Sequence, residues 1–591
     1  MNRWVLKRNK VQIAAMAQEL GISPIKANVL ANRGLVNRHD ANLFISGNLE
    51  DVPSPFLLKD MELALQLVDA AIHSGKKIVI YGDYDVDGVT STTILTQTVR
   101  KLGGTVSYYL PHRQKEGYGL NLEAVETLGN MKTEFLLTCD NGISSIKEIA
   151  RAKELGMQVV IIDHHEPGFL GSGDTKKDIL PEADAIIDHK QQACTYPNQT
   201  LCAGALSYLF AKELLTKNNV SDVDFVEELL VFATIATVCD MVDLLGENRV
   251  LVQHGLQKIG NTQNIGLQAL IHATGLSDKQ ITAYHLGFVI GPCINATGRL
   301  ESGEMAVALF CETNPEAAKE KAETLKYLNE ERKHMTQEAA LLAEEKIEKE
   351  QLLENKVLVI YEKEIHESVA GIVAGRIKEK YHRPVVLITG AEDGAKGSGR
   401  SVEGFDLFAA LYECKELFTK FGGHAMAAGL SLPEENIPEL DRMLNASCPL
   451  TVEEMTPVLR LDGVLQFVEM DMRLAMELED LAPFGKANPS PLFVSQNIKI
   501  DRIQLMGKNR DMMRLTLLEP KTGKRLSAVS FDGYEKMKKL LKELHTQEEC
   551  DTIMAGGKCT VPMDFVYQID INTYNGRSSV QLMVKDFRCS K

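Results

Sequence analysis

The sequence predicts a multidomain α/β protein with a β-rich C-terminal part, and three observations indicate this fold class. Between about residues 60 and 170, apolar β-branched runs alternate with helix-length segments, which is typical of βαβ units and a parallel sheet. From residue 314, a stretch without glycine that is rich in Ala, Glu, Lys and Leu predicts one long helix. After "LAPFGKANPSPLF", strand-like runs predominate, which favours a small barrel.

Length and composition bound the class of protein. The 591 residues are 44% hydrophobic and 25% charged, which is ordinary for a soluble globular protein, and the chain is too long for a single core. The net charge of −16 argues against a general nucleic-acid coat. Local basic patches still bind polyanions, so a DNA or RNA substrate is not excluded.

The cysteines and the apolar runs predict a cytoplasmic protein without a membrane anchor. Eleven scattered cysteines include no C-x-x-C pair, which argues against a zinc ribbon and a disulfide framework and favours a reducing compartment. No apolar run reaches the length of a membrane span, and "LLVFATIATVCDMVD" stops at Asp240. We expect that run to be a buried helix.

The elements follow in order along the chain. Residues 1–55 predict short helices and turns, because Gly21, Pro24 and Gly34 interrupt them. Residues 56–313 predict the main α/β domain, whose strands include "KKIVIY", "TVSYYLP", "EFLLTCD" and "QVVIIDHH".

The second half of the chain contains three further predicted parts. Residues 314–356 predict a long, largely exposed connector helix, and residues 357–450 a smaller α/β unit with "KVLVIY" and "PVVLITG" as strands. Residues 451–591 predict a barrel, with Asn575-Gly576 as a hairpin turn between its last two strands. An oligonucleotide-binding barrel is one choice.

Three carboxylates end the first predicted strand of the main domain. In "KIVIYGDYDVDGVTST", Asp83, Asp85 and Asp87 precede Gly88. A calcium loop of the EF-hand type would need a Glu at the twelfth position from Asp83, where this chain has Ile94. Open α/β sheets bind ligands beyond the carboxyl ends of their strands. The motif therefore indicates either a divalent metal site or a solvated acidic turn.

Two further strand ends repeat this pattern. "FLLTCDNG" places Asp140, and "VVIIDHHEPG" places Asp163, His164 and His165, at the same edge of a parallel sheet. Asp240, after a long apolar stretch, is either another ligand or an ordinary helix-end residue. Carboxylates and imidazoles without a thiolate suit Mn²⁺ or Mg²⁺ better than Zn²⁺. Two such ions are plausible, and they indicate hydrolysis of a phosphoester or phosphoanhydride.

The order of these motifs resembles a known family. "GDYDVDGVTST", "CDNG" and "DHH" resemble the successive motifs of the DHH phosphoesterase superfamily. "YYLPHRQKEGYGL", "GALSYLF", "GPCINATGRL", "YLNEER", "GSGRS", "FGGHAMAAGL" and "PFGKANPSPLF" resemble the RecJ family within it, over nearly the whole chain. The resemblance implies a parallel-sheet DHH domain, a long helix, a DHH-associated domain and an oligonucleotide-binding barrel. It also implies a single-strand-specific 5′-to-3′ DNA exonuclease of repair and recombination that releases 5′-mononucleotides.

The resemblance also implies roles for individual residues. The implied ligands of two Mn²⁺ or Mg²⁺ ions are Asp85, Asp87, Asp140, His164 and Asp240, with Asp140 as the bridge and Asp83 as a further candidate. His165 is implied to face the scissile phosphate as a general acid or transition-state stabiliser, and the alternative is a hydrogen bond that orients His164. The implied phosphate-binding residues are Arg113, Arg299, Ser398, Arg400, Ser401 and His424.

The resemblance further implies how a strand is selected and which partners meet it. A narrow cleft between the two α/β domains admits one strand and excludes a duplex, and the barrel offers a basic platform at Lys508, Arg510, Arg514 and Arg577. Single-stranded DNA is the expected partner, and a single-strand-binding protein and a helicase are candidate protein partners. No membrane is expected to be involved, and the expected oligomeric state is a monomer. Cys293 stands where the family often has Arg, so one basic contact is absent or replaced.

Two alternative functions, a smaller-substrate hydrolase of the same superfamily and a non-catalytic scaffold, fit the sequence less well. Smaller superfamily members, such as nano-RNases, nucleotide phosphatases, cyclic-dinucleotide phosphodiesterases and pyrophosphatases, have a His where this chain has Tyr81, and they lack a β-rich tail. A non-catalytic scaffold would have lost metal ligands, whereas all of them are present here.

Overall fold

The structure is a computed structural model that describes residues 2–171, 177–391, 394–507 and 510–590. Its chain divides into two compact units. One, here called the two-sheet unit, comprises Val52–Val242 and Leu251–Thr456. The other, here called the barrel unit, comprises Met1–Asp51, Asp243–Val250 and Pro457–Lys591.

The first sheet of the two-sheet unit is parallel throughout, as the alternation of strands and helices predicts. Its five strands lie in the order β3-β2-β4-β5-β8. Their bounds are β2 Ile78–Tyr81, β3 Val106–Tyr109, β4 Phe135–Cys139, β5 Gln158–Ile162 and β8 Ala185–Ile187. Helices cover both faces of such a sheet, which is why its strands are nearly continuous apolar runs.

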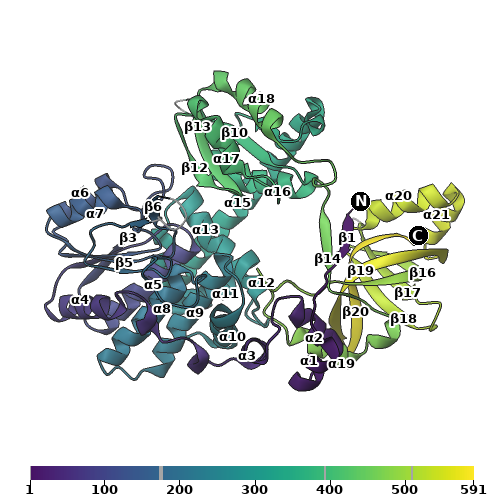
Figure 1. Cartoon of the computed structure of the whole chain (residues 1–591), viewed down its shortest axis with the longest axis horizontal. Coiled ribbons are helices and arrows are strands. Elements are labelled where there is room, and N and C mark those ends of the chain that lie inside the picture. The colour runs from purple at the N-terminus through teal and green to yellow at the C-terminus, as the bar shows by residue number, and fades with distance from the viewer. Residues whose placement is uncertain (1, 172–176, 392–393, 508–509, 591) are drawn as a thin grey trace. The chain divides into compact units, whose positions relative to one another are not determined.

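Helices on the two faces of the sheet connect its parallel strands, so every strand ends at the same edge of the sheet. Figure 1 shows α6 (Leu122–Asn130) and α7 (Ile146–Glu154) on one face, and α4 (Met61–His73), α5 (Val86–Lys101) and α8 (Ala203–Lys217) on the other. The carboxyl ends of β2, β4, β5 and β8 therefore lie side by side. Apolar α9 (Val223–Cys239) packs against α5 and α8 and is buried over most of its length, which confirms the expected buried helix.

A run of helices leads from the first sheet to the second. They are α10 Gly246–Lys258, α11 Ile265–Ala273, α12 Ala283–His285, the π-helix Leu286–Ile290, α13 Gly291–Leu300, α14 Glu304–Phe310 and α15 Pro315–Lys349. The Asn314 side chain caps α15 by accepting hydrogen bonds from the amides of Glu316 and Ala317. One side of α15, including Ala322 and Leu325, is buried against α11, α13 and α16 (Glu367–Tyr381). Its other side is exposed, so the helix is both the exposed connector that the sequence predicts and a packing element.

The second sheet of the two-sheet unit is mixed. Its order is β12-β13-β11-β10-β9, and only β9 and β10 run parallel. The strands are β9 Leu358–Tyr361, β10 Val385–Ala391, β11 Gly394–Arg400, β12 Lys420–His424 and β13 Ala427–Leu432. Helices α16 (Glu367–Tyr381), α17 (Leu407–Glu413) and α18 (Ile437–Ser447) accompany it.

The barrel unit contains the closed barrel that the C-terminal strands predict. Pairing of β16 with β19 closes the order β16-β17-β18-β20-β19. The strands are β16 Phe493–Met506, β17 Met512–Leu518, β18 Arg525–Ser530, β19 Cys559–Tyr574 and β20 Arg577–Cys589. Asn575 and Gly576 connect the last two with φ of 49° and 74°, which confirms the predicted hairpin turn.

The N-terminal segment belongs to the barrel unit. Helices α1 (Ile13–Leu20), α2 (Pro24–Ala31) and α3 (Arg38–Ser46) share a hydrophobic core with the barrel. The sequence did not predict β1 (Arg3–Leu6), which pairs in parallel with β14 (Val458–Leu461). Four residues carry too little pattern to identify a strand whose partner lies so far along the chain.

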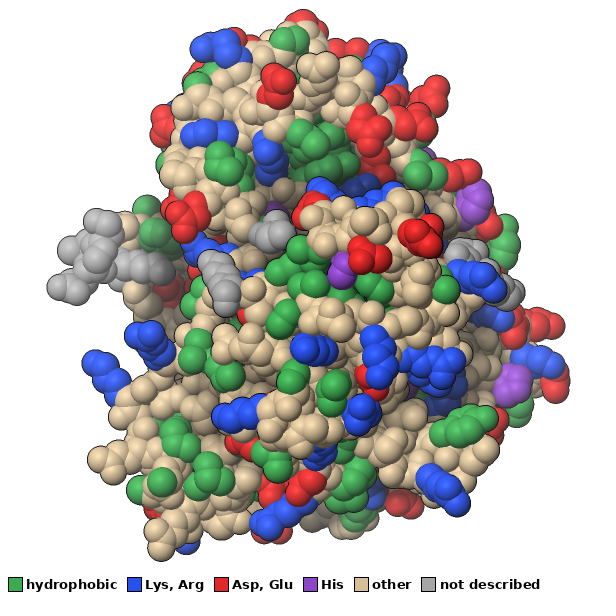
Figure 2. Space-filling model, turned by 90° about the vertical axis from the view of Figure 1, so that its right-hand side faces the viewer, with side chains coloured by type: hydrophobic (Ala, Val, Ile, Leu, Met, Phe, Trp, Pro, Cys, Tyr) green, Lys and Arg blue, Asp and Glu red, His purple; other side chains and the backbone are tan. Residues whose placement is uncertain are grey.

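The surface carries both signs of charge. Figure 2 shows Lys and Arg side chains dispersed over much of one face, with Asp and Glu side chains among them. The acidic total of the chain therefore does not make its surface uniformly acidic. In the part of the chain that the structure describes, no helix is both long and apolar enough to span a membrane.

Candidate metal centre and nucleic-acid interface

The acidic loop after β2 is folded into the start of α5. The Asp85 carboxylate caps this helix, accepting hydrogen bonds from the amides of Asp87 (2.9 Å) and Gly88 (3.2 Å). A Cβ on Gly88 would lie 2.4 Å from the carbonyl oxygen of Asp83, so only glycine lets the loop close here. Asp83 and Asp87 are both buried. The loop is therefore not a solvated acidic turn.

Asp87 is held by the N-terminus of α8. Its two carboxylate oxygens accept hydrogen bonds from the amides of Ala203 (2.8 Å) and Gly204 (2.7 Å). Free amides and the helix dipole favour negative charge at such a position. One of these oxygens, Oδ2, also lies 3.5 Å from Nε2 of His164. The start of α8, where the segment "GALSYLF" begins, thus fixes the carboxylate of Asp87 from the first acidic motif.

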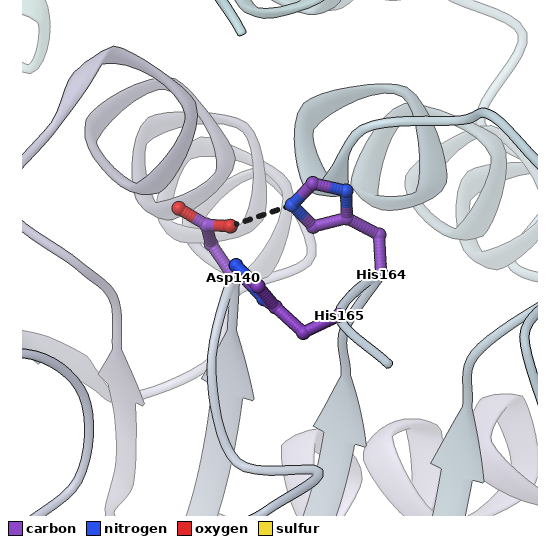
Figure 3. Close-up of side chains that lie close together, drawn as sticks. All are labelled: Asp140, His164 and His165. Atoms are coloured by element: carbon purple, nitrogen blue, oxygen red, sulfur yellow. Dashed lines mark hydrogen bonds and ion pairs between the residues drawn. The ribbon is translucent and has the colours of Figure 1, made fainter. Parts of the chain in front are cut away.

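Asp140 and His164 meet across neighbouring strand ends. Asp140 follows β4 and His164 follows β5, and Oδ1 of Asp140 lies 3.1 Å from Nε2 of His164 (Figure 3). Asp140 has a φ of 62°, in the left-handed region that few residues other than glycine occupy. Strained backbone of this kind persists where the surroundings hold it, and it clusters at functional sites.

His165 forms a hydrogen-bonded pair with Asp163. Its Nδ1 donates to Oδ1 of Asp163 at 2.7 Å, and its Nε2 lies 2.9 Å from the hydroxyl of Tyr118. With the hydroxyl proton directed at the carbonyl oxygen of Asp140 (2.8 Å), a charged imidazole satisfies all of these groups, and its Nε2–H donates to Tyr118. Burial opposes the charge of His165, but the hydrogen bond to Asp163 and the charges of Asp163 and of neighbouring carboxylates together raise its pKa to about 9.

The six predicted ligands come together in overlapping groups. Ligand atoms lie within 4.8 Å of one another in the groups Asp83/Asp85/Asp140, Asp87/His164/Asp240 and Asp140/His164/His165. Asp140 and His164 each belong to two groups. Asp240 stands at the C-terminal end of α9 with Oδ2 3.9 Å from Nδ1 of His164.

The electrostatics of this cluster fit divalent cations. Burial, and then the charge of a neighbouring carboxylate, raises the pKa of Asp87 and of Asp240 to about 7. The same causes raise the pKa of Asp83 and Asp140 well above the ordinary value. Oδ2 of Asp83 is buried and has no hydrogen-bond partner. Crowded carboxylates with one imidazole are the donor set that hard cations such as Mn²⁺ and Mg²⁺ take.

Sequence reasoning missed two residues beside the cluster. Tyr118, which holds His165, lies within "YYLPHRQKEGYGL", but nothing in that segment predicts the contact. Asp188 follows β8 and is fully buried, and its Oδ1 accepts a hydrogen bond from the amide of Lys190. Burial and then the charge of Asp163 raise the pKa of Asp188 to about 8. The apolar run "AIID" repeats the strand-end pattern and could have identified it.

A second feature of the two-sheet unit is a basic pocket of about 270 Å³. Residues associated with both sheets line it, among them Arg113, Ser398 and Lys396, and the carboxylate of Glu367, which also lines it, pairs with Lys396 at 2.8 Å. Nearby, Nη1 of Arg299 donates to the carbonyl oxygen of Ser368 at 3.0 Å.

The arginines at this pocket repel one another. Burial and then the charge of Arg113 lower the pKa of Arg299 to about 9, and the same two causes lower the pKa of Arg400. Nη1 of Arg400 donates to the hydroxyl of Ser398 and to the carbonyl oxygen of Gly399. Converging guanidinium groups of this kind are suited to phosphate.

The other predicted phosphate-binding residues lie differently. The Ser401 hydroxyl is buried and donates to the carbonyl oxygen of Phe405 at 2.7 Å, so a backbone turn already uses it. His424 is exposed at the end of β12, in the β12–β13 hairpin. In the barrel unit Arg510, Arg514 and Arg577 are exposed, and Lys508 lies outside the described residues.

An arginine, Arg332, lies near Cys293, the residue that stands where the family often has Arg. The Cys293 thiol is buried and accepts a hydrogen bond from Nδ2 of Asn329 (3.3 Å). Oδ1 of Asn329 in turn accepts from Nη2 of Arg332 at 2.9 Å. Burial and then the charge of Arg376 lower the pKa of Arg332. Arg332, in the segment "YLNEER", was not singled out from the sequence.

Three models of known domain families match the chain. They are the N-terminal domain of the DHH family over residues 77–237, the DHHA1 domain over residues 354–448 and the RecJ OB domain over residues 461–586. Their order is the order of the first sheet, the second sheet and the barrel.

Curated proteins and solved structures agree with these matches. The single-stranded-DNA-specific exonuclease RecJ of Bacillus subtilis is 34% identical over 594 residues, which cover 100% of this chain and 71% of that protein. RecJ of Salmonella typhimurium is 31% identical, with 99% of both chains covered. The crystal structure of RecJ with Mn²⁺ from Thermus thermophilus has the same fold, with a TM-score of 0.80 at 24% identity over 100% of this chain and 80% of that one. Exonuclease RecJ bound to manganese is 31% identical, with a TM-score of 0.56 over 66% of this chain and 94% of that one.

Proposed function

This chain belongs to the RecJ family of single-stranded-DNA-specific exonucleases, and we infer that it degrades single-stranded DNA from the 5′ end to 5′-mononucleotides. The reaction is two-metal hydrolysis of phosphodiester bonds and serves DNA repair and recombination. The observation that carries this function is the convergence of carboxylates and an imidazole from four separate segments, Asp83–Asp87, Asp140, His164 and Asp240, on one sheet edge.

The cofactors are Mn²⁺ or Mg²⁺, two ions per site. We propose that Asp83, Asp85, Asp87, Asp140, His164 and Asp240 would hold them. Asp140 is proposed as the shared ligand, because its carboxylate belongs to the group of Asp83 and Asp85 and also lies 3.1 Å from His164 of the other group. When bound, the ions make a water nucleophilic at neutral pH and neutralise charge on the phosphate. The raised pKa values of the carboxylates support this assignment, since a cation would relieve their repulsion.

His165 is proposed as the residue that faces the scissile phosphate. Asp163 keeps its imidazole charged, so Nε2–H donates a hydrogen bond to the hydroxyl of Tyr118 when no strand is bound. With a strand in place, the same N–H would donate to the phosphate oxygens or to the departing 3′-oxygen. Asp140 contributes by fixing His164 and by accepting at its carbonyl the proton of Tyr118.

The basic pocket is proposed to hold the substrate phosphates. Arg113, Arg299, Ser398 and Arg400 supply donors there, and a guanidinium can bind phosphate through two N–H groups. Ser401 would act through the backbone that it braces, and exposed His424 would contact the strand farther from the pocket. Exposed Arg510, Arg514 and Arg577 are proposed as a platform for the strand on the barrel.

We propose a monomer that works in the cytoplasm with a single-strand-binding protein and a helicase as partners, and the free thiols of all eleven cysteines support a reducing compartment. We also propose residues 1–55, 56–313, 314–356, 357–450 and 451–591 as the functional segments of the chain. Limited proteolysis followed by mass spectrometry tests these limits, since cleavage is expected near them.

Digestion of end-labelled DNA tests the function. Single strands labelled at the 5′ or the 3′ end, and a matched duplex, are incubated with the protein and Mn²⁺ or Mg²⁺, beside an Asp140→Ala variant. Early release of labelled mononucleotide from the 5′ end of the single strand only is expected, with no release by the variant. Preferential hydrolysis of dinucleotides, cyclic dinucleotides or pyrophosphate would contradict it and favour a smaller-substrate phosphoesterase.

A further inference from the structure

Two exposed aromatic rings stack on each other in the two-sheet unit. Tyr284 and Phe288 are 63% and 67% exposed, their ring centroids lie 4.9 Å apart, and their planes meet at 24°. The pair spans α12 and the π-helix Leu286–Ile290. π-Helical turns are rare, and many of them occur at functional sites.

Packing places the π-helix that carries Phe288 against the end of α9, the helix that leads into the metal cluster. The Cys239 thiol donates to the carbonyl oxygen of Leu286 at 3.5 Å, and a Cβ on Gly291 would lie 2.5 Å from that sulfur. The π-helix therefore presses closely on the end of α9. The next residue after Cys239 is Asp240, one of the carboxylates of the cluster.

Stability alone does not account for the pair. An aromatic pair on a helix surface adds only a few tenths of a kcal/mol. Both rings leave most of their apolar area in water, so neither gains the free energy that burial would give. A ring pair in this place is better explained by a ligand with a flat apolar face.

One basic side chain lies near the rings. Lys279 is exposed, and its charge adds to burial in lowering the pKa of His285, the residue between the two rings. Aromatic rings next to cationic side chains are the pattern by which proteins bind single strands without reading their sequence. The bases stack on the rings, and the phosphates meet the cations.

We propose that Tyr284 and Phe288 form a stacking platform for nucleobases of the single strand whose end lies in the metal site. This proposal rests on the proposed function and adds a base-binding surface to it. Every base has a flat π face, so the platform holds any sequence. A base pair in a duplex already has its faces stacked and cannot offer one, so the platform also favours a single strand.

Binding to modified strands tests the platform in full-length protein. An Asp140→Ala background prevents cleavage, and fluorescence of 2-aminopurine placed at successive positions of a single strand reports stacking. The variant Tyr284→Ala/Phe288→Ala is compared with Tyr412→Ala, which removes another exposed ring of the same unit. We expect the double variant to bind about tenfold more weakly and to lose the quenching at one or two positions, as the loss of one stacked base predicts.

Two further arms make the result specific. Abasic residues at those same positions should weaken the binding of the parent protein but not that of the double variant. Phe288→Trp should retain binding and Phe288→Leu should lose it, because stacking requires a ring. Equal binding by the double variant and Tyr412→Ala, or full binding by Phe288→Leu, overturns the platform.

The cleavage assay separates the two proposals. A parent chain that fails to release 5′-mononucleotides refutes the proposed function itself. A parent chain that does so, while the double variant binds the strand as tightly as the Tyr412→Ala control, refutes only the platform.

Discussion

Asp163 and His165 share a hydrogen bond of 2.7 Å between Oδ1 and Nδ1 just beyond β5. Although burial opposes both charges, this bond and the neighbouring charges together lower the pKa of Asp163 to about 2 and raise that of His165 to about 9. The Asp163 carboxylate also accepts hydrogen bonds from the backbone amides of Ile143 and His164, so the orientation of this carboxylate is fixed. The pair therefore presents a charged imidazole next to the metal cluster.

Asp163→Asn should remove the charge that keeps His165 protonated. We expect kcat at pH 7 to fall roughly 100-fold, the scale of one general acid–base contact, while Mn²⁺ affinity is unchanged. Stopped-flow digestion and calorimetric titration of Mn²⁺ measure the two quantities. Asp188→Asn is the matched control. Its carboxyl also ends a strand and is buried, but its pKa of about 8 leaves it mostly protonated at pH 7, so the amide should change kcat little.

Asp140→Asn should abolish hydrolysis yet stabilise the metal-free protein. The amide removes one of several buried like charges, and Asn tolerates the left-handed backbone of this position. We expect the Tm without metal at pH 8 to rise by roughly 2 °C or more, which calorimetry can detect. Exposed Asp278→Asn should leave both Tm and activity unchanged. A lower Tm for Asp140→Asn would show that its carboxylate stabilises the fold.

Metal should stabilise the protein more at pH 8 than at pH 6. Asp87 and Asp240 have folded pKa values of about 7, above the ordinary unfolded value near 4. The folded state thus binds more protons, and their contribution to stability is lost as the pH rises through 7. Mn²⁺ replaces these protons. Thermal unfolding with and without Mn²⁺ at both pH values checks this, and an equal gain in Tm at pH 6 and pH 8 would refute it.

Arg400→Gln should weaken substrate binding without altering chemistry. Arg400 lies at the basic pocket and far along the chain from the metal ligands, so we expect KM for single-stranded DNA to rise roughly tenfold at constant kcat. The slope of log KM against log salt concentration should decrease in size by about one, as the loss of one phosphate contact predicts. Arg442→Gln, which breaks only an exposed pair with Glu439, is the control. A salt slope unchanged by Arg400→Gln would exclude the contact.

Much of the fold follows from local pattern. Apolar runs such as "IVIY" and "FLLTC" form strands because their side chains are buried on both faces. Asn575 and Gly576 form a hairpin because both accept a positive φ. Carboxylates placed directly after such runs had to meet at one sheet edge, since crossovers between parallel strands share one hand.

Other contacts could not be predicted from pattern. Tyr118 reaches His165 from a loop, and Ser401 turns its hydroxyl to Phe405 rather than outward. β1 finds its partner β14 in a segment some 450 residues away. Each depends on the path of a loop or on a side-chain rotamer, and neither leaves a periodic signal in the sequence.

Residue order and local chemistry thus suffice to identify the strands, the turn and the side chains able to bind metal, because burial and backbone preference act over a few neighbouring positions. Folding in three dimensions alone establishes which of those side chains touch. It pairs Asp163 with His165, places Asp87 on the amides of α8 and packs the π-helix that carries Phe288 against the end of α9. These contacts arise because distant segments pack into one densely filled interior, where every side chain has a single place.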